Sequence, residues 1–253
     1  MIINKGRIAD AFCKSSNSYD EAAVVQREVI DRLVYSCEQI LDPKHNRILE
    51  IGCGTGLLSE KFTQRFTVNE YFLNDLSQSL CERAEHKVVN NVLKTKTVAG
   101  DAEKIELPKQ CDVILSSSTM QWFENIPAFI SASLTHLVDN GYIAISLFTE
   151  GTMNEVKALT EKSLNYVSVA ELQETLACGY KIKIFESVKK QLFFQNIKEL
   201  LLHIKKTGAA GLPGSPLTIT ELRKFERDYV NCFQTKRGLP LTYSFVLAIA
   251  QKR

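Results

Sequence analysis

Five short apolar runs alternate with helical patterns through the first part of the chain. In order, they lie near residues 47–51, 69–74, 95–99, 111–117 and 141–148. Between them, apolar residues recur at the spacing of amphipathic helices, which place one apolar face against a core. Strands that alternate with helices in this way predict a parallel sheet with crossover helices. The pair Asn140-Gly141 predicts a turn into the fifth strand.

The pattern changes on both sides of this region. Residues 1–45 predict a leading arm and a helix over residues 21–40, which Pro43 ends. Beyond residue 150, further helices are predicted at residues 154–165, 168–177, 196–206 and 218–230, with a strand-like hairpin at 180–194 and a last strand at 242–250. A loop with three glycines and two prolines, residues 208–216, separates the last two helices.

The turn after the first apolar run carries the strongest chemical signal. Glycines occupy alternate positions, Gly52, Gly54 and Gly56, shortly after Glu50. Glycine allows positive φ angles and close approach of the backbone to a ligand. The third glycine comes one residue earlier than in a dinucleotide-binding turn, and the Glu50 carboxylate would repel a pyrophosphate. The turn therefore favours a cationic ligand without phosphates over an NAD site or a glycine turn that binds nothing.

Polar residues follow the next predicted strands. Asp75 ends the second strand about 20 residues past the glycine turn, the spacing expected of a carboxylate that binds ribose hydroxyls. Asn74 is a second candidate ribose ligand. Asp75 is also a good helix N-cap, although Ser77 can take that role instead. Asp101 follows the third strand as a ligand or an ordinary turn residue. Ser116 to Ser118 form the end of the fourth strand, where open α/β sheets bind ligands.

The E-x-G-x-G-x-G pattern at residues 50–56 resembles motif I of the class I S-adenosylmethionine-dependent methyltransferases. The resemblance implies an α/β, Rossmann-like class I methyltransferase fold, with a mostly parallel seven-stranded sheet whose last strand is antiparallel. We also expect an N-terminal helical arm and a helical insertion before the last strands. In that family the residue at Glu50 lies near the methionine part of the cofactor. The carboxylate at Asp101 accepts from the adenine amino group, and the backbone N–H of Ala102 donates to the ring. The implied cofactor is S-adenosylmethionine, with S-adenosylhomocysteine as product.

Further segments are similar to the malonyl-acyl-carrier-protein O-methyltransferases of biotin biosynthesis. They include Met120-Gln121-Trp122 and Leu241-Thr242-Tyr243, and the complete set is residues 5–12, 18–20, 25–27, 116–117, 120–122, 151–155, 205–211 and 240–243. Thr220 is the expected cap of the helix after residue 217. The chain departs from the family at Ser117, where Asn is common. On this resemblance we expect one domain over residues 1–253: an N-terminal arm and helix (1–45), a cofactor-binding core (46–150), and a substrate or lid region with the final strands (151–253).

The implied reaction is methyl transfer to the free malonyl carboxylate of the carrier-bound thioester, giving the methyl ester that starts pimeloyl synthesis for biotin. A carboxylate is ionised near neutral pH, so no general base is needed and none is nominated. Tyr19, Gln121 and Trp122 are expected to position substrate and cofactor. Tyr243 and a cation are expected to meet the substrate or its arm, and the candidate cations are Lys205, Lys206 and Arg237.

Composition sets the class of protein. At 253 residues and 45% apolar, the chain can bury a substantial core, and no apolar run is long enough to span a membrane. The start of the sequence lacks the apolar region of a signal peptide. Seven scattered cysteines without C-x-x-C spacing predict free thiols in a reducing compartment, so we expect a cytoplasmic enzyme. The four histidines are isolated, which predicts no metal site.

Charge is uneven although the net charge is only +2. Residues 1–150 hold 15 Lys and Arg against 20 Asp and Glu, a net −5, and residues 151–253 hold 16 against 9, a net +7. The basic half predicts an acidic partner, malonyl-acyl-carrier protein or malonyl-coenzyme A, unless its lysines are only solvated. Nucleic acid is not expected, because interleaved aromatic residues are lacking. Two other interpretations stay open: a methyltransferase for another small molecule, such as a quinone precursor, and a binding module without catalysis.

Overall fold

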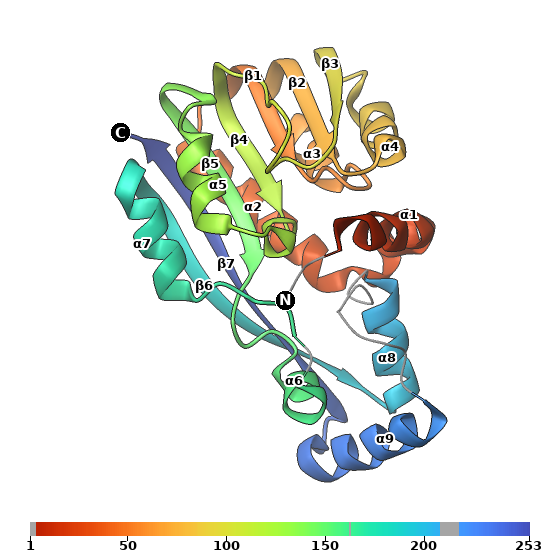
Figure 1. Ribbon diagram of the computed structural model, residues 1–253. Coiled ribbons are helices and arrows are strands. Elements are labelled where there is room, and N and C mark those ends of the chain that lie inside the picture. Colours follow the sequence, from red (N-terminus) through yellow and green to blue (C-terminus); the bar gives the residue numbers. More distant parts are fainter. Residues whose placement is uncertain (1–3, 162, 208–217) are drawn as a thin grey trace.

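The computed structural model describes residues 4–161, 163–207 and 218–253, and its centre is a seven-stranded sheet (Figure 1). The strands are β1 (Lys44–Ile51), β2 (Thr67–Asp75), β3 (Val92–Ala99), β4 (Cys111–Ser117), β5 (Leu137–Phe148), β6 (Tyr180–Phe194) and β7 (Leu239–Lys252). Their order across the sheet is β3-β2-β1-β4-β5-β7-β6. The first five strands run parallel, and β7 runs antiparallel to both of its neighbours. The predicted mostly parallel sheet with an antiparallel last strand is thus confirmed.

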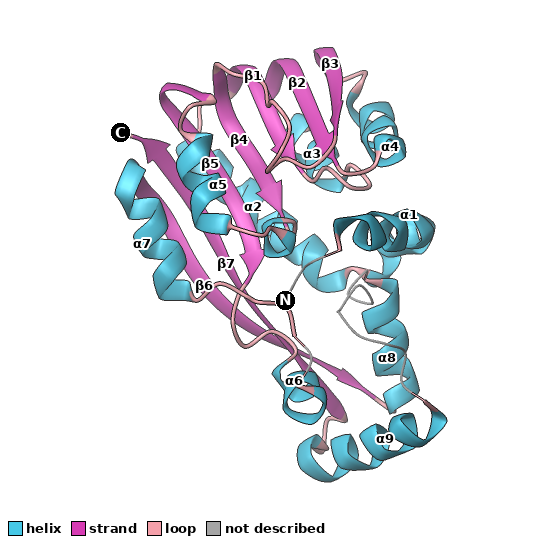
Figure 2. Ribbon diagram, in the orientation of Figure 1, coloured by secondary structure: helices cyan, strands magenta, loops and turns pink. Residues whose placement is uncertain are grey.

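Helices cover both faces of this sheet (Figure 2). On one face lie α2 (Val24–Ile40), α3 (Leu57–Thr63) and α4 (Gln78–Val88), and on the other α5 (Ile126–Ser133) and α7 (Val169–Gly179). A central parallel strand is therefore buried on both sides, which explains its continuous apolar run. The last four residues of β1 are each at most 1% exposed, and Glu50 is the charged side chain among them.

A second cluster of helices forms where β6 and β7 extend past the rest of the sheet. α6 (Asn154–Thr160), α8 (Ile197–Lys206) and α9 (Ile219–Phe233) enclose a separate core that includes Phe148, Tyr229 and Phe245. α1 (Lys5–Ala22) contacts α8, and the short helix η1 (Met120–Trp122) follows β4. In the described ranges, no helix is long and apolar enough to cross a membrane.

Four local predictions were wrong. Residues 180–194 form one continuous strand, because β6 pairs with β7 along its length. The pair Asn140-Gly141 lies inside β5, where Asn140 has φ 61° and the register to β4 shifts, so it makes a bulge and not a turn. The helix predicted at 154–165 ends at Thr160, since Glu161 turns to φ 56°. Thr218, and not Thr220, caps α9, in a capping box with the carboxylate three residues later.

The predicted N-terminal helical arm is α1. The chain bends at Ala23 before α2 begins, so the helix predicted over residues 21–40 starts at Val24. The predicted loop at residues 208–216 lies outside the described residues. The division of the chain into arm, core and C-terminal region stays a prediction.

Candidate functional site

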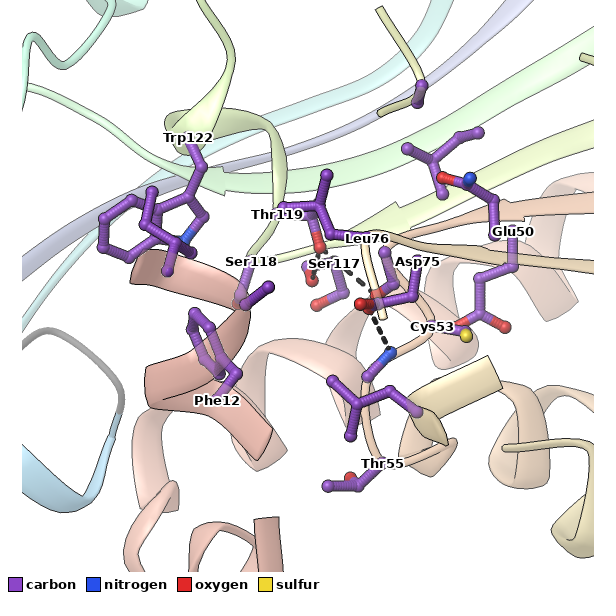
Figure 3. Close-up of a pocket in the computed structure, with 18 of the residues that line it drawn as sticks. Phe12, Glu50, Cys53, Thr55, Asp75, Leu76, Ser117, Ser118, Thr119 and Trp122 are labelled. Atoms are coloured by element: carbon purple, nitrogen blue, oxygen red, sulfur yellow. Dashed lines mark hydrogen bonds between the residues drawn. The ribbon is translucent and has the colours of Figure 1, made fainter. Parts of the chain in front are cut away.

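A large pocket opens at the carboxyl ends of β1, β2 and β4, against α1. It holds about 1060 Å³ of open space, which includes the solvent at its mouth. Glu50, Asp75 and Asp101 line it, as does the turn between β1 and α3. Phe12 and Trp122 lie on one side of the cavity (Figure 3). This edge is where open α/β sheets bind ligands.

The three glycines of the turn have different tasks, although all have positive φ. A Cβ on Gly52 would lie 2.2 Å from the side chain of Thr119, and one on Gly56 would lie 2.6 Å from the Cα of Ala84. A Cβ on Gly54 would meet no protein atom within 4 Å, although Gly54 lines the pocket. Packing of the protein therefore requires glycine at positions 52 and 56, whereas Gly54 leaves room for a ligand against the backbone.

Glu50 is a buried carboxylate at the end of β1. Its Oε2 accepts hydrogen bonds from the hydroxyls of Ser59 (2.6 Å) and Tyr71 (2.8 Å). Burial nevertheless raises the pKa of Glu50 from 4.5 to about 7, and the nearby Asp75 adds to the increase. Glu50 thus has no cationic partner in the part of the chain that the structure describes, and it lines the pocket. A positively charged group of a ligand would offset the free-energy cost of burying this carboxylate in its ionised form.

Glu50→Gln should therefore stabilise the cofactor-free protein at alkaline pH. A folded-state pKa above the unfolded value costs stability as pH rises from 4.5 to about 7, and the full cost remains above that range. The gain should be on the order of 3 kcal/mol near pH 8, and it should vanish below about pH 4.5. Urea unfolding of parent and variant at both pH values measures it. A variant less stable than the parent near pH 8 would contradict the assignment.

Asp75 lies at the end of β2 and holds the glycine turn (Figure 3). Its two oxygens accept the backbone N–H groups of Gly54 and Ser77, each at 3.0 Å, and burial raises its pKa. The Ser77 side chain makes no capping bond. The Asn74 amide donates to the carbonyls of Val98 (2.7 Å) and of the residue two positions later (3.1 Å). Asn74 therefore orders the loop after β3, and its donors are already engaged.

Asp101 forms an ion pair with Lys5 of α1. The Lys5 Nζ lies 2.6 Å from Asp101 Oδ1 and also contacts the Glu103 carboxylate. The backbone N–H of Glu103 donates to the same Asp101 oxygen at 3.1 Å. Burial raises the pKa of Asp101, but these hydrogen bonds and the nearby lysines outweigh it, and the pKa is lowered overall. An adenine amino group would compete with Lys5 or use Oδ2. Ala102 lines the pocket beside this pair.

A smaller chamber adjoins the pocket. It holds about 410 Å³ of open space, and five side chains line both cavities: Phe12, Tyr19, Gln26, Ser118 and Trp122. Gln121 and Tyr243 also belong to the wall of the chamber. The structure thus brings together Tyr19 of α1, Gln121 and Trp122 of η1, and Tyr243 of β7. Tyr243 is held from outside by the His203 ring, whose Nε2 lies 2.8 Å from its hydroxyl.

Five predicted residues line neither cavity. The hydroxyl of Ser116 is buried and donates to a backbone carbonyl of β1 at 2.9 Å, so it joins two strands. Lys205 and Lys206 are exposed on α8. The guanidinium of Arg237 lies 4.0 Å from the centre of the Phe193 ring. Gly56, as described, serves the packing of α3. Sequence reasoning assigned no role to Lys5 or Gln26, because only the fold brings their side chains to the cavities. Ser118, at the predicted ligand-binding end of the fourth strand, does line both cavities.

Comparison with known proteins identifies the family. A family model described as a methyltransferase domain matches residues 49–145. The malonyl-acyl-carrier-protein O-methyltransferase of Acinetobacter baylyi is 31% identical over 255 residues, 99% of this chain and 98% of the relative. That of Haemophilus influenzae is 32% identical over 251 residues, 98% of this chain and 95% of the relative. The chain belongs to the malonyl-acyl-carrier-protein O-methyltransferase family. It spans only 50% of a longer family member from Bacteroides fragilis, to which it is 34% identical over 251 residues.

Solved structures share the fold of this family member. A Bacillus halodurans protein superposes with a TM-score of 0.64 at 13% identity, over 88% of this chain and 98% of the other. The N-methyltransferase NodS of Bradyrhizobium japonicum, in complex with S-adenosylhomocysteine, has a TM-score of 0.52 at 12% identity, over 89% and 86%. At these identities the likeness shows the class I methyltransferase fold alone. The family relationship makes the chain a methyltransferase that uses S-adenosylmethionine.

The pocket fits the cofactor of the family. S-adenosylmethionine carries a sulfonium and an ammonium group, and the lining holds three carboxylates, two of them without a cationic partner among the bonds described above. The open space above Gly54 is the close-approach position that a ligand requires. In the described part of the chain, no cluster of His, Cys, Asp and Glu has the arrangement of a metal site.

Proposed function

We propose that the chain methylates the free carboxylate of malonyl-acyl-carrier protein, the substrate in the names of its relatives. One observation favours a carboxylate as acceptor: the described residues that line the smaller chamber include no His, Asp, Glu, Lys or Cys that would act as a base. A carboxylate needs none, because it is already ionised near neutral pH. The product ester would begin the synthesis of the pimeloyl chain of biotin.

A quinone precursor is a weaker candidate for the same reason. Its phenolic hydroxyl has a pKa near 10 and must lose a proton during methylation. The tyrosines of the chamber stay protonated and so cannot accept this proton, because burial raises the pKa values of Tyr19, Tyr166 and Tyr243 still further. The His203 ring lies behind Tyr243 and does not line the chamber. The arrangement therefore supports an acceptor that arrives already deprotonated.

We assign the cofactor contacts by the charges of the pocket. Glu50 faces the methionine ammonium, Asp75 accepts from the ribose hydroxyls, and Asp101 with Ala102 holds the adenine. When bound, S-adenosylmethionine supplies an electrophilic methyl group on its sulfonium. The protein orients the two reactants and excludes water. Tyr19 and Trp122 do so by bordering both cavities at their junction.

Methyl transfer from labelled S-adenosylmethionine to malonyl-carrier protein tests the proposed function, with acetyl-carrier protein as control. Labelled malonyl methyl ester without an acetyl product would support it, because only the malonyl group carries a free carboxylate. No transfer to malonyl-carrier protein by a protein that still binds S-adenosylhomocysteine would refute it. Transfer to a phenolic precursor would then favour the small-molecule alternative.

We further propose that the acidic carrier docks on the basic C-terminal half, near α8. This helix ends beside the smaller chamber, since Thr207 lines the chamber while Lys205 and Lys206 are exposed just before it. The pantetheine arm of a docked carrier would then reach the chamber from the surface of α8. The free state of all seven cysteines supports the cytoplasmic location that we propose with this function.

Reversal of Lys205 and Lys206 to Glu should raise KM for malonyl-carrier protein about tenfold and KM for malonyl-coenzyme A much less. Exposed charges act mainly by long-range attraction, so the difference should shrink as salt is added. Steady-state kinetics with both thioesters at low and high salt measure the effect. Lys94→Glu with Lys96→Glu, on the distant β3, is the matched control. An equal rise of KM for both thioesters would contradict a carrier-docking surface on α8.

A further inference from the structure

Unpartnered polar atoms gather in the smaller chamber. Among the described residues, several buried side-chain polar atoms have no hydrogen-bond partner, and four of these belong to the chamber lining: Gln26 Oε1, Ser118 Oγ, Gln121 Oε1 and Trp122 Nε1. Gln26, Gln121 and Trp122 are each at most 8% exposed. Native proteins leave few such atoms, so a concentration of them at one cavity indicates a ligand that completes the hydrogen bonds.

Ser118 and Trp122 provide the two donors of this group, at the junction of the cavities. Ser118 has φ 54°, a conformation that non-glycine residues adopt rarely and mostly where function requires it. Its backbone N–H donates to the Ser146 carbonyl (2.8 Å), and its own carbonyl accepts from Gln121 Nε2 (2.7 Å). The backbone of Ser118 is thus fixed from two sides while its hydroxyl has no partner.

Three other hydroxyls of the chamber wall, those of Thr152, Thr207 and Tyr243, are already engaged. Tyr243 pairs with His203 at 2.8 Å, and Thr207 donates to the His203 carbonyl at 3.0 Å. Thr152 donates to the Ser244 carbonyl at 2.7 Å. The Ser118 hydroxyl and the Trp122 N–H are better placed than these three groups to donate to a ligand oxygen, because both are buried and neither has a partner among the described residues.

The chamber wall also lacks a charge. None of the described residues that line it is charged at neutral pH. Among the side chains that the structure does not describe, that of Lys162 is the only cationic one. The candidate cations Lys205, Lys206 and Arg237 do not line the chamber. We infer that the smaller chamber is the acceptor site, and that the neutral donors Ser118 Oγ–H and Trp122 Nε1–H hold the substrate carboxylate in place of a cation. This inference rests on the proposed function.

A neutral site suits a reaction that removes charge. A bond forms between the carboxylate oxygen and the methyl carbon, and the carbon–sulfur bond breaks with its electron pair staying on sulfur. A carboxylate and a sulfonium thereby become a neutral ester and a neutral thioether, and no proton moves. A buried cation against the carboxylate would stabilise the substrate more than the transition state, where that negative charge is partly lost. Neutral donors bind the acid but stabilise it less strongly over the transition state than a cation would, and they release the ester.

The two glutamine oxygens identify the rest of the ligand. Gln121 Nε2 is committed to the Ser118 carbonyl, so its Oε1 is fixed as an acceptor, and Gln26 Oε1 is a second one. A carboxylate cannot satisfy them, because it has no donor. An amide N–H can, and the pantetheine arm of a malonyl thioester carries two amides. The chamber therefore matches a ligand with an acidic end and an amide-containing arm.

Trp122 is the only tryptophan of the chain, so its fluorescence reports occupation of the chamber. Malonyl-pantetheine, its methyl ester and acetyl-pantetheine are titrated into the full chain loaded with S-adenosylhomocysteine, with calorimetry in parallel. We expect a saturable change of fluorescence with the acid. The affinity for the ester and for the acetyl thioester should be about tenfold lower, because each lacks the anionic oxygens that strengthen the hydrogen bonds.

Ser118→Ala and Trp122→Phe each remove one donor. Each should weaken binding of the acid about tenfold by calorimetry, with a change below about twofold for the ester. Ser118→Ala alters the volume little, so it keeps the test valid if Trp122→Phe folds poorly, and thermal unfolding of the loaded variants checks the fold. Lys162→Gln is the matched control and should leave both affinities unchanged.

Two outcomes would overturn the neutral acceptor site. One is a loss of acid affinity in Lys162→Gln but not in the two donor variants, because a cation would then hold the carboxylate. The other is methylation of malonyl-carrier protein by the parent while Trp122 fluorescence does not respond to malonyl-pantetheine, which would leave the proposed function standing. Absence of transfer to every malonyl thioester would instead refute the proposed function, and the inference with it.

Discussion

Asp75→Ala should weaken binding of S-adenosylhomocysteine about 100-fold or more. Two ribose hydroxyls donating to a buried carboxylate form charge-assisted hydrogen bonds, each worth about 1.5–3 kcal/mol. Burial has already raised the pKa of Asp75, so the carboxylate is incompletely compensated by its two backbone donors and gains from further ones. Titration calorimetry with S-adenosylhomocysteine at neutral pH measures the loss.

Two further variants separate the ligand role of Asp75 from its structural role. Asp75→Ala also frees the N–H groups of Gly54 and Ser77, which should lower the melting temperature of the cofactor-free protein. Asp75→Asn keeps one carbonyl oxygen for the turn but removes the charge, so it should retain more stability and still lose affinity. Asp139→Ala, at an exposed carboxylate, should change neither quantity. Equal affinity of Asp75→Ala and the parent would contradict the ribose assignment.

The sheet was predictable because its signal is local. Apolar runs separated by helical patterns are typical of crossover units, and the order of such strands follows from the resemblance that the glycine turn carries. The predicted strands near residues 47–51 and 111–117 lie inside β1 and β4. Asp75 lies where the spacing from the glycine turn places it, at the end of β2.

The exceptions arise where pairing over long distances decides the conformation. Residues 180–194 contain polar and apolar residues in a pattern that fits a hairpin equally well. The fold favours one long strand because β7, with its fourteen residues, pairs with this segment along its whole length. Likewise, the bulge at Asn140 depends on the register to β4, and no local sequence specifies a register between distant strands.

The substrate side of the site was the least predictable part. Basic residues are easy to find in a sequence. Lys205, Lys206 and Arg237 are candidates for the substrate site because a carboxylate attracts cations. In the structure Lys205 and Lys206 are exposed, and Arg237 lies over the Phe193 ring. The described residues of the chamber wall are all neutral. Lys5 is the opposite case, a basic residue that does reach the site although the sequence does not predict it. Nothing near it in sequence predicts a partner at Asp101, 96 positions away, and only the placement of α1 brings the two together.

Gly56→Ala and Gly54→Ala should have opposite principal effects, although the two glycines are two residues apart in one turn. Either alanine would occupy a left-handed conformation, which costs about 1–2 kcal/mol. At position 56 the new methyl group also meets the backbone of α4 at 2.6 Å, and overpacking adds about 1–3 kcal/mol. Gly56→Ala should therefore lower the free energy of unfolding by about 3 kcal/mol in total.

At position 54 the methyl group meets no protein atom, so the free energy of unfolding of Gly54→Ala should fall by only about 1 kcal/mol. The methyl group instead enters the space where the backbone approaches the cofactor, and the affinity for S-adenosylhomocysteine should fall at least about tenfold. Urea unfolding without ligand and calorimetry with ligand measure the two effects in both variants. If Gly54→Ala bound the cofactor as the parent does, or if it were the less stable of the two, the space above Gly54 would not be the cofactor's, and the glycine turn would have to bind it elsewhere.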